Sequence, residues 1–187
     1  MEKTTNALVV LERLGRLLQN DAHRHGLKPT QWEALRYLGR ANRFSRSPGA
    51  VTAYLGMTKG TVSQTLAALE RKGLIRKVTV PKDRRNVTIE MTRKGTALLK
   101  KDPLEDLEAA TLRLADEQRT QLGESLRQLL GNALQQRDGR PFGACNTCRH
   151  FQKDAEDGKP HRCGLLDEPL SAPDSELICV EQEPLQV

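Results

Sequence analysis

Residues 55–75 of this sequence read Leu-Gly-Met-Thr-Lys-Gly-Thr-Val-Ser-Gln-Thr-Leu-Ala-Ala-Leu-Glu-Arg-Lys-Gly-Leu-Ile. Gly56 is placed to end one short helix, and Thr58 to cap a second helix that Gly73 ends. The first of these helices begins at Ser47-Pro48, where a serine cap precedes a proline in the first turn. Two short helices joined by a tight glycine turn are the pattern of a helix-turn-helix.

The second of these helices carries different residues on its two faces. Val62, Leu66 and Leu69 recur at helical spacing and form an apolar face. The opposite face near the N-terminus is small and polar, as a helix needs to be where it approaches base edges in the DNA major groove. The alternative is a helix end that is merely capped and solvated. The residues predicted to contact DNA from this helix are Thr58, Lys59, Gly60, Thr61, Ser63 and Gln64.

Two β-runs follow directly, at residues 74–80 and 87–91. The segment between them, residues 81–86, is a turn sequence with Lys82, Arg84 and Arg85 at its expected tip. A basic hairpin directly after a helix-turn-helix predicts a wing, and the narrow DNA minor groove favours an inserted arginine. A solvated turn with no DNA contact is the alternative.

The positive charge of the chain is concentrated around these elements. The whole chain has a net charge of +6, whereas residues 43–101 contain 14 Lys and Arg against 3 Asp and Glu. Residues 102–140 and 141–187 are both net acidic. Charge alone fits a solvated face as well as a surface for the phosphate backbone, and the neighbouring motifs favour DNA.

Leucine-rich helices are expected on both sides of this region. Residues 6–21 form an amphipathic pattern, and residues 104–136 are strongly helical with a break near Ala115, where Asp116 is the expected cap. These stripes carry more leucine than one winged helix buries, which predicts dimerisation through them. The sequence therefore predicts a mainly α fold with a small β-wing. It comprises a winged helix-turn-helix domain with terminal dimerisation helices at 1–140 and a short cysteine-rich, loop-rich tail at 141–187.

Residues 1–140 resemble the MarR family of bacterial transcriptional regulators. The matching segments are Pro29-Thr30-Gln31-Trp32, residues 55–63, residues 69–75, Asp83-Arg84-Arg85 and Thr92-Arg93-Lys94-Gly95. The resemblance implies an obligate dimer whose winged helix lies between dimerising terminal helices. It also implies a minor-groove role for Arg84 or Arg85, with Asp83 orienting a neighbouring arginine.

The tail contains all four cysteines of the chain, spaced as Cys145-x2-Cys148-x14-Cys163-x15-Cys179. Its apolar residues are too few for an independent core, so a covalent or metal staple is expected. Disulfides are rare in the cytoplasm, and a Cys-x-x-Cys pair is a common chelating turn. The spacing therefore favours a metal centre held by these four cysteines, with a redox-active dithiol or inert thiols as alternatives.

The identity of the metal is less constrained. One close pair followed by two single cysteines is similar to high-potential iron–sulfur proteins and to the small iron–sulfur subunits of some glycyl-radical enzymes. This resemblance favours a [4Fe–4S] cluster, and tetrahedral Zn2+ also accepts four thiolates. His150 and His161 are possible substitute ligands, expected instead near the centre or at the surface.

Two functions are compatible with these features. The first is a homodimeric regulator that binds double-stranded DNA and whose tail senses redox, iron or metal state. Because the tail follows the predicted dimerisation helix, ordering it would change the spacing of the two recognition helices. The second is a winged-helix protein with a structural zinc module for protein contact, regulated by a small-molecule effector.

No phosphate loop, H-E-x-x-H motif or nucleophile–base pair is recognisable, so an enzyme is not expected. Neither a signal peptide nor a membrane span is recognisable, and the expected location is the cytoplasm.

Overall fold

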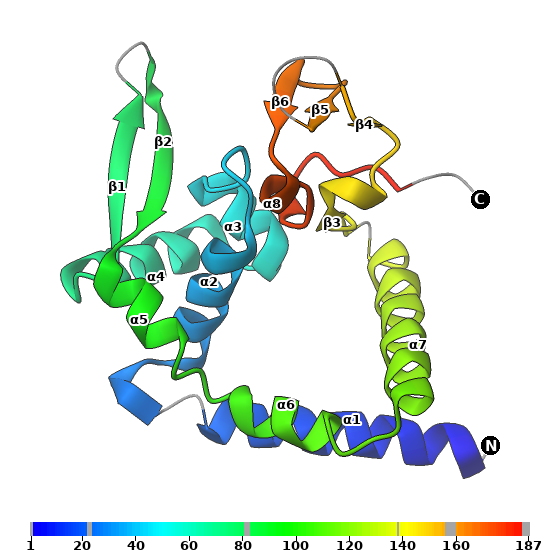
Figure 1. Ribbon diagram of the computed structural model, residues 1–187. Helices are drawn as coiled ribbons and strands as arrows, with labels where there is room; N and C mark the ends of the chain where they lie inside the picture. Colours follow the sequence, from blue (N-terminus) through cyan, green and yellow to red (C-terminus); the bar gives the residue numbers. More distant parts are fainter. Residues whose placement is uncertain (1, 22–23, 81–82, 138, 156–159, 185–187) are drawn as a thin grey trace.

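The computed structural model describes residues 2–21, 24–80, 83–137, 139–155 and 160–184. The fold is mainly helical with small antiparallel sheets, as the sequence predicts. Figure 1 shows its three parts: a winged-helix body with an upright hairpin, helices that extend away from that body, and a C-terminal tail that returns to it.

The body is built from four helices and one hairpin. The helices are α2 (Pro29–Arg40), α3 (Pro48–Leu55), α4 (Lys59–Arg71) and α5 (Arg93–Leu99), and the hairpin strands are β1 (Ile75–Val80) and β2 (Asp83–Met91). The predicted caps are confirmed: Ser47 Oγ accepts from Ala50 N, and Thr58 Oγ1 accepts from Thr61 N. Gly56 ends α3 in the left-handed conformation at φ 61°. These local signals position α3 and α4 as a helix-turn-helix.

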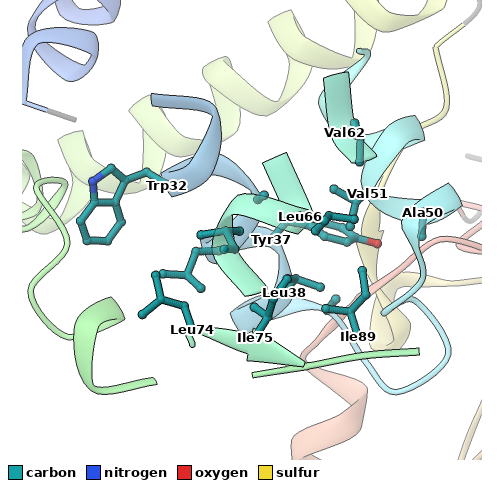
Figure 2. Close-up of a cluster of buried hydrophobic side chains, with 14 of the residues drawn as sticks. Trp32, Tyr37, Leu38, Ala50, Val51, Val62, Leu66, Leu74, Ile75 and Ile89 are labelled. Atoms are coloured by element: carbon teal, nitrogen blue, oxygen red, sulfur yellow. The ribbon is translucent and has the colours of Figure 1, made fainter. Parts of the chain in front are cut away.

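One core lies inside this body (Figure 2). Aliphatic side chains supply most of it, as the low aromatic content requires, and the aromatic exceptions are Trp32 and Tyr37. At its edge the chain leaves β1 and β2 and enters α5, where Gly95 lies against the carbonyl of Leu74. A Cβ at this position would meet that carbonyl, so only glycine permits the close approach. The largest fully buried side chains of this core are Trp32, Leu35, Tyr37, Leu38, Val51, Val62, Leu66, Leu69, Leu74, Ile75 and Ile89.

The wing differs from the sequence prediction at its end. Residues 83–86, expected in the turn, are part of strand β2. The pairing register shifts there, because Thr79 faces Val87 while Val80 faces Asp83. The extra residues of β2 therefore form an irregularity within the ladder, and strand pairing has overridden the local turn propensity. The predicted tip residue Lys82 lies outside the described residues.

Helices α1 (Glu2–Asp21), α6 (Glu105–Thr111) and α7 (Asp116–Gln135) form the extended part, called the arm here. In the described residues, none of the three packs extensively against another helix or strand. The predicted break near Ala115 is confirmed, but its expected cap is wrong. Ala115 is the N-cap residue, and its backbone N–H donates to the side chain of Gln118 while Asp116 is already helical.

The tail is a set of short elements with two small sheets. Strands β3 (Gly143–Ala144) and β7 (Ile178–Cys179) pair with each other, and β5 (His161–Cys163) lies between β4 (Phe151–Lys153) and β6 (Glu168–Leu170). Two short helices complete it, η2 (Cys145–Thr147) and α8 (Ala172–Ser175). Phe142, Ile178 and Val180 pack against the core of the body. The tail thus contacts the winged helix and not only the helix that precedes it.

No described helix has both the length and the apolar character that a membrane span requires.

Candidate functional site

The predicted reading residues lie on one exposed face at the start of α4. Thr58, Lys59, Gly60, Thr61, Ser63 and Gln64 are all exposed, whereas Val62, Leu66 and Leu69 are buried against the core. The hydroxyl groups of Thr58 and Thr61 lie 2.9 Å apart and bond each other. Thr58 therefore serves as the cap, and the side chains of Lys59, Ser63 and Gln64 are accessible to a ligand.

A groove of about 540 Å³ runs between α4 and the start of α2. Thr61, Ser63 and Gln64 form part of it, together with two cations that sequence reasoning missed, Lys28 and Arg71. Lys28 precedes α2 and Arg71 is in the last turn of α4, so no local motif joins them. Their positive charge extends the predicted DNA-contacting face beyond the N-terminus of α4.

The wing is fixed to the reading helix by Glu70. Its Oε1 accepts a hydrogen bond from the backbone N–H of Lys77 at 3.1 Å, and its Oε2 lies 3.2 Å from the Lys77 ammonium. On β2, Arg84 and Arg85 belong to the strand by their backbone. The wing and α4 therefore form one connected unit, and the hairpin that carries both arginines extends from it (Figure 1).

The four cysteines, far apart in the sequence, line one cavity in the tail. Cys145 lies in η2 and Cys148 directly after it, Cys163 ends β5, and Cys179 ends β7. Cys145 and Cys179 are buried, at 6% and 5% exposure. Between the cysteines the cavity is lined by apolar side chains, Phe151, Leu165 and Leu170 among them. All four are free cysteines with no disulfide.

Nitrogen donors point at three of the four sulfurs. Asn42 Nδ2 lies 3.2 Å from Cys145 Sγ, and the backbone N–H of Glu183 lies 3.5 Å from Cys148 Sγ. The backbone of Glu181 hydrogen-bonds Cys179. N–H groups directed at sulfur stabilise thiolate over thiol, which is the form that metals bind.

The side chains of Cys145 and Cys179 are hydrogen-bonded to each other. The hydrogen bond between the Cys145 and Cys179 side chains lowers the pKa of Cys179 and raises the pKa of Cys145. One sulfur of the pair is therefore ready to act as a thiolate while its neighbour donates.

The cavity lined by the four cysteines is small. Its free volume is about 10 Å³, about the space of one water molecule. Among the described residues, no three Cys, His, Asp or Glu side chains have the geometry to hold a metal ion as they stand. A single ion would thus require cysteine side-chain rotation, and a four-iron cluster would require the four side chains to move outward. The backbone already brings all four to one place.

The two histidines of the tail have other partners. His150 borders the cavity, with its Nε2 3.5 Å from a carboxylate oxygen of Glu183. His161 packs against Phe151 with the two rings tilted and their centroids 4.9 Å apart. Neither is needed to complete a four-ligand set.

The arrangement can be compared with known proteins. Residues 25–86 match the sequence profile of the MarR family. A MarR transcriptional regulator from Methanosarcina mazei is similar at 26% identity and a TM-score of 0.57, over 72% of this chain and 99% of that one. BldR from Sulfolobus solfataricus is 23% identical with a TM-score of 0.56, over 70% of this chain and 94% of its own.

The DNA complex of S. aureus MepR is 22% identical with a TM-score of 0.56, over 66% of this chain and 96% of its own. A comparison with curated protein sequences found no match. Because the similar chains are covered almost completely, more than a quarter of this chain extends beyond the fold that they share. Residues 25–86, which include α2, α3, α4 and β1, thus match the MarR family, and the fold built around them is the winged helix-turn-helix of MarR regulators.

Proposed function

We propose that this protein is a homodimeric, sequence-specific DNA-binding transcriptional regulator whose four C-terminal cysteines hold a metal centre that senses redox, iron or metal state. The observation that carries the DNA-binding part is the exposed polar face of α4, joined to the wing through Glu70. An exposed helix face beside a basic hairpin supplies major-groove and minor-groove contacts from one rigid unit.

Two further observations support a DNA ligand. The concentration of 14 Lys and Arg in residues 43–101 surrounds this face with positive charge, which releases counterions when phosphates are bound. Among proteins that share the fold, MepR was solved in complex with DNA.

Dimer formation is supported by the arm. Exposed leucines gather on it, with Leu8 at 59%, Leu112 at 64% and Leu130 at 59% exposure. Among the described residues these helices do not pack extensively against any other helix or strand, and apolar surface of this extent on such helices is typical of a subunit interface.

The test of DNA binding is fluorescence anisotropy on DNA from upstream of the protein's own coding region, measured at several salt concentrations. We expect a steep fall in affinity with salt and a preference over scrambled DNA of the same composition. Equal affinity for the scrambled DNA would contradict sequence-specific binding.

The sensing part of the proposal rests on the shared cavity and its sulfur-directed N–H groups. Four thiolates suit both a [4Fe–4S] cluster, which the cysteine spacing favours, and Zn2+. Anaerobic purification followed by visible absorbance and metal analysis separates the two. Brown protein with iron and sulfide indicates the cluster, and colourless protein with one zinc indicates the structural ion.

Sensing itself requires that the centre change DNA affinity. We expect the loaded protein to differ from the metal-free protein by at least about tenfold, which corresponds to about 1.4 kcal/mol of coupling. A Cys145→Ser/Cys148→Ser variant should behave as metal-free, whereas Asn146→Ser in the same turn should behave as the parent. Equal affinities in all states would reduce the tail to a structural appendage.

A further inference from the structure

The loop between α2 and α3, residues 41–46, is the part of the body that the cysteine centre touches. Ala41 forms a parallel bridge with Ile178 of β7, and the backbone N–H of Asn42 donates to the Ile178 carbonyl at 2.9 Å. Asn42 and Ser45 are both fully buried at 0% exposure. Polar side chains buried to this degree are kept only where their hydrogen bonds are made.

The Asn42 side chain joins the sulfur to the loop. Its Nδ2 donates to Cys145 Sγ at 3.2 Å, over a sequence separation of 103 residues. Its Oδ1 accepts from Ser45 Oγ at 2.7 Å and from the backbone N–H of Phe44 at 3.1 Å. The amide is therefore oriented from one side by the loop, and its N–H is directed at the cysteine from the other.

From Ser45 the hydrogen bonds continue toward wing strand β2 and helix α3. Ser45 Oγ accepts from the backbone N–H of Val180 in the tail at 2.8 Å. The next residue, Arg46, accepts at its carbonyl from the backbone N–H of Ile89 in wing strand β2 at 2.7 Å. Ser47 then caps α3. Five residues of chain thus lie between the residue that bonds the cysteine and the start of the helix-turn-helix.

We propose that Asn42 is the positioning residue through which the cysteine centre acts on the DNA-reading elements, and that residues 41–46 are the path. This inference rests on the metal-sensing function proposed above and names its route. The route runs through the body of the same subunit, not through the spacing of the two subunits.

The difference between the two states comes from the acceptor. A thiol sulfur is a weak hydrogen-bond acceptor, whereas a metal-bound thiolate accepts a charge-assisted bond. Loading the centre therefore strengthens the Asn42 bond and holds the loop, α3 and β2 in the arrangement described here. Emptying it weakens that bond and allows the loop to move. We take the arrangement described here as the one that binds DNA, so that the loaded protein has the higher DNA affinity.

Cobalt is the probe, because Co2+ bound to four thiolates gives intense charge-transfer and visible bands. Full-length protein is prepared metal-free and titrated with Co2+, and DNA affinity is measured with and without the metal. Asn42→Leu removes the N–H donor at similar volume. Ser45→Ala keeps that donor but breaks the next step, and serves where Asn42→Leu does not fold. Arg43→Gln is the matched control, because Arg43 contacts the tail at Asp174 and the Pro169 carbonyl but no sulfur.

In the wild type we expect thiolate–cobalt bands and at least about tenfold tighter DNA binding when loaded. In Asn42→Leu the same bands should appear with Co2+ affinity lowered by about 10–100-fold, and the loaded and empty forms should bind DNA equally. Ser45→Ala should lose the effect on DNA with a smaller loss of Co2+ affinity than Asn42→Leu, because the Ser45 side chain also hydrogen-bonds Cys179. Arg43→Gln should retain both.

Each other outcome is decisive. Cobalt-loaded Asn42→Leu that keeps the full effect on DNA overturns the route and leaves the sensing function standing. If Arg43→Gln loses as much of the cobalt effect on DNA affinity as Asn42→Leu, docking of the tail transmits the signal and not the bond to sulfur. This result also overturns the proposed route. Wild-type protein without thiolate–cobalt bands contradicts the metal centre itself, and the inference with it.

Discussion

Arg36 of α2 holds Asp102, the residue at which the chain leaves the body for the arm, through two hydrogen bonds of 2.7 and 2.6 Å. Both side chains are only 15% exposed. Burial raises the pKa of the Asp102 carboxyl, but the hydrogen bonds and charge of Arg36, the backbone N–H of Leu104 and the charge of Arg40 outweigh it, and the pKa is lowered. The pair fixes the direction in which α6 departs.

This ion pair predicts a pH-dependent contribution to stability. A lowered pKa means that the stabilisation is complete above the pKa of the carboxyl in the unfolded chain and is lost as the pH falls through its folded value. Asp102→Asn should lower the free energy of unfolding by about 1.5–3 kcal/mol at pH 7, and by much less in acid. Urea denaturation from pH 7 downward measures the difference, and a deficit that does not change with pH would contradict this account. Glu117→Gln, an exposed carboxylate in the first turn of α7, is the control.

Removing the two wing arginines should weaken DNA binding on every sequence. Arg84→Ala/Arg85→Ala deletes two cations from β2, so the slope of log affinity against log salt should fall by about 2 if both contact phosphates or the minor groove. Arg137→Ala/Lys153→Ala removes the same charge outside the basic region and should leave the slope unchanged. A wing variant that binds as well as the parent at moderate salt would show that the wing does not contact DNA.

Base preference should depend on Gln64. Its side chain is exposed on the α4 face and borders the groove toward α2. Gln64→Ala should relax discrimination at one or two base pairs, by about 1–3 kcal/mol for each lost base contact. Competition between a library of operator variants reveals the change, with Gln128→Ala on α7 as the matched control. An unchanged preference would limit α4 to backbone contacts.

Dimerisation should depend on the leucine stripe of α7. Leu126 and Leu129 are 41% and 45% exposed and share one face. Leu126→Glu/Leu129→Glu should give a monomer in light scattering, because it places charge in an apolar interface. Thr120→Glu/Gln128→Glu adds the same charge on the opposite face and should remain dimeric. Dimers from both variants would require another interface.

The junction of the wing and α5 should not tolerate a methyl group. Gly95→Ala places a Cβ against the Leu74 carbonyl, and should cost about 1–3 kcal/mol of stability. Gly131→Ala in α7 has open space around it, and should be neutral or stabilising by up to about 1 kcal/mol. Chemical denaturation of the two variants gives opposite signs if the close approach is real.

The sequence predicts the parts of the fold that depend on neighbouring residues. Ser47, Gly56, Thr58 and Gly73 act within a few residues of their own position, so their caps and turns follow from local chemistry. The prediction that residues 83–86 form part of the turn was wrong, because cross-strand pairing, a non-local contact, extends β2 to Asp83.

The candidate site divides in the same way. The α4 face is periodic and could be predicted. That the four cysteines lie together in the tail could also be predicted, from their spacing. The role of Asn42 could not be predicted, because it depends on a hydrogen bond to Cys145, which lies 103 residues later in the chain. Lys28 and Arg71 likewise become neighbours only once α2 packs against α4.

The return of the tail to the body anchors the α6–α7 part of the arm at both ends. Asp102 fixes the start of α6 to α2, and beyond the end of α7 Arg140 bonds the Val180 carbonyl of the docked tail. Between them run α6, the break near Ala115 and α7, a helix of 20 residues, about 30 Å long. With the tail docked this segment has two fixed ends, and a released tail would leave it one, at Asp102. Because a released tail would stay tethered close to its own docking surface, its return would be an intramolecular step that does not depend on protein concentration.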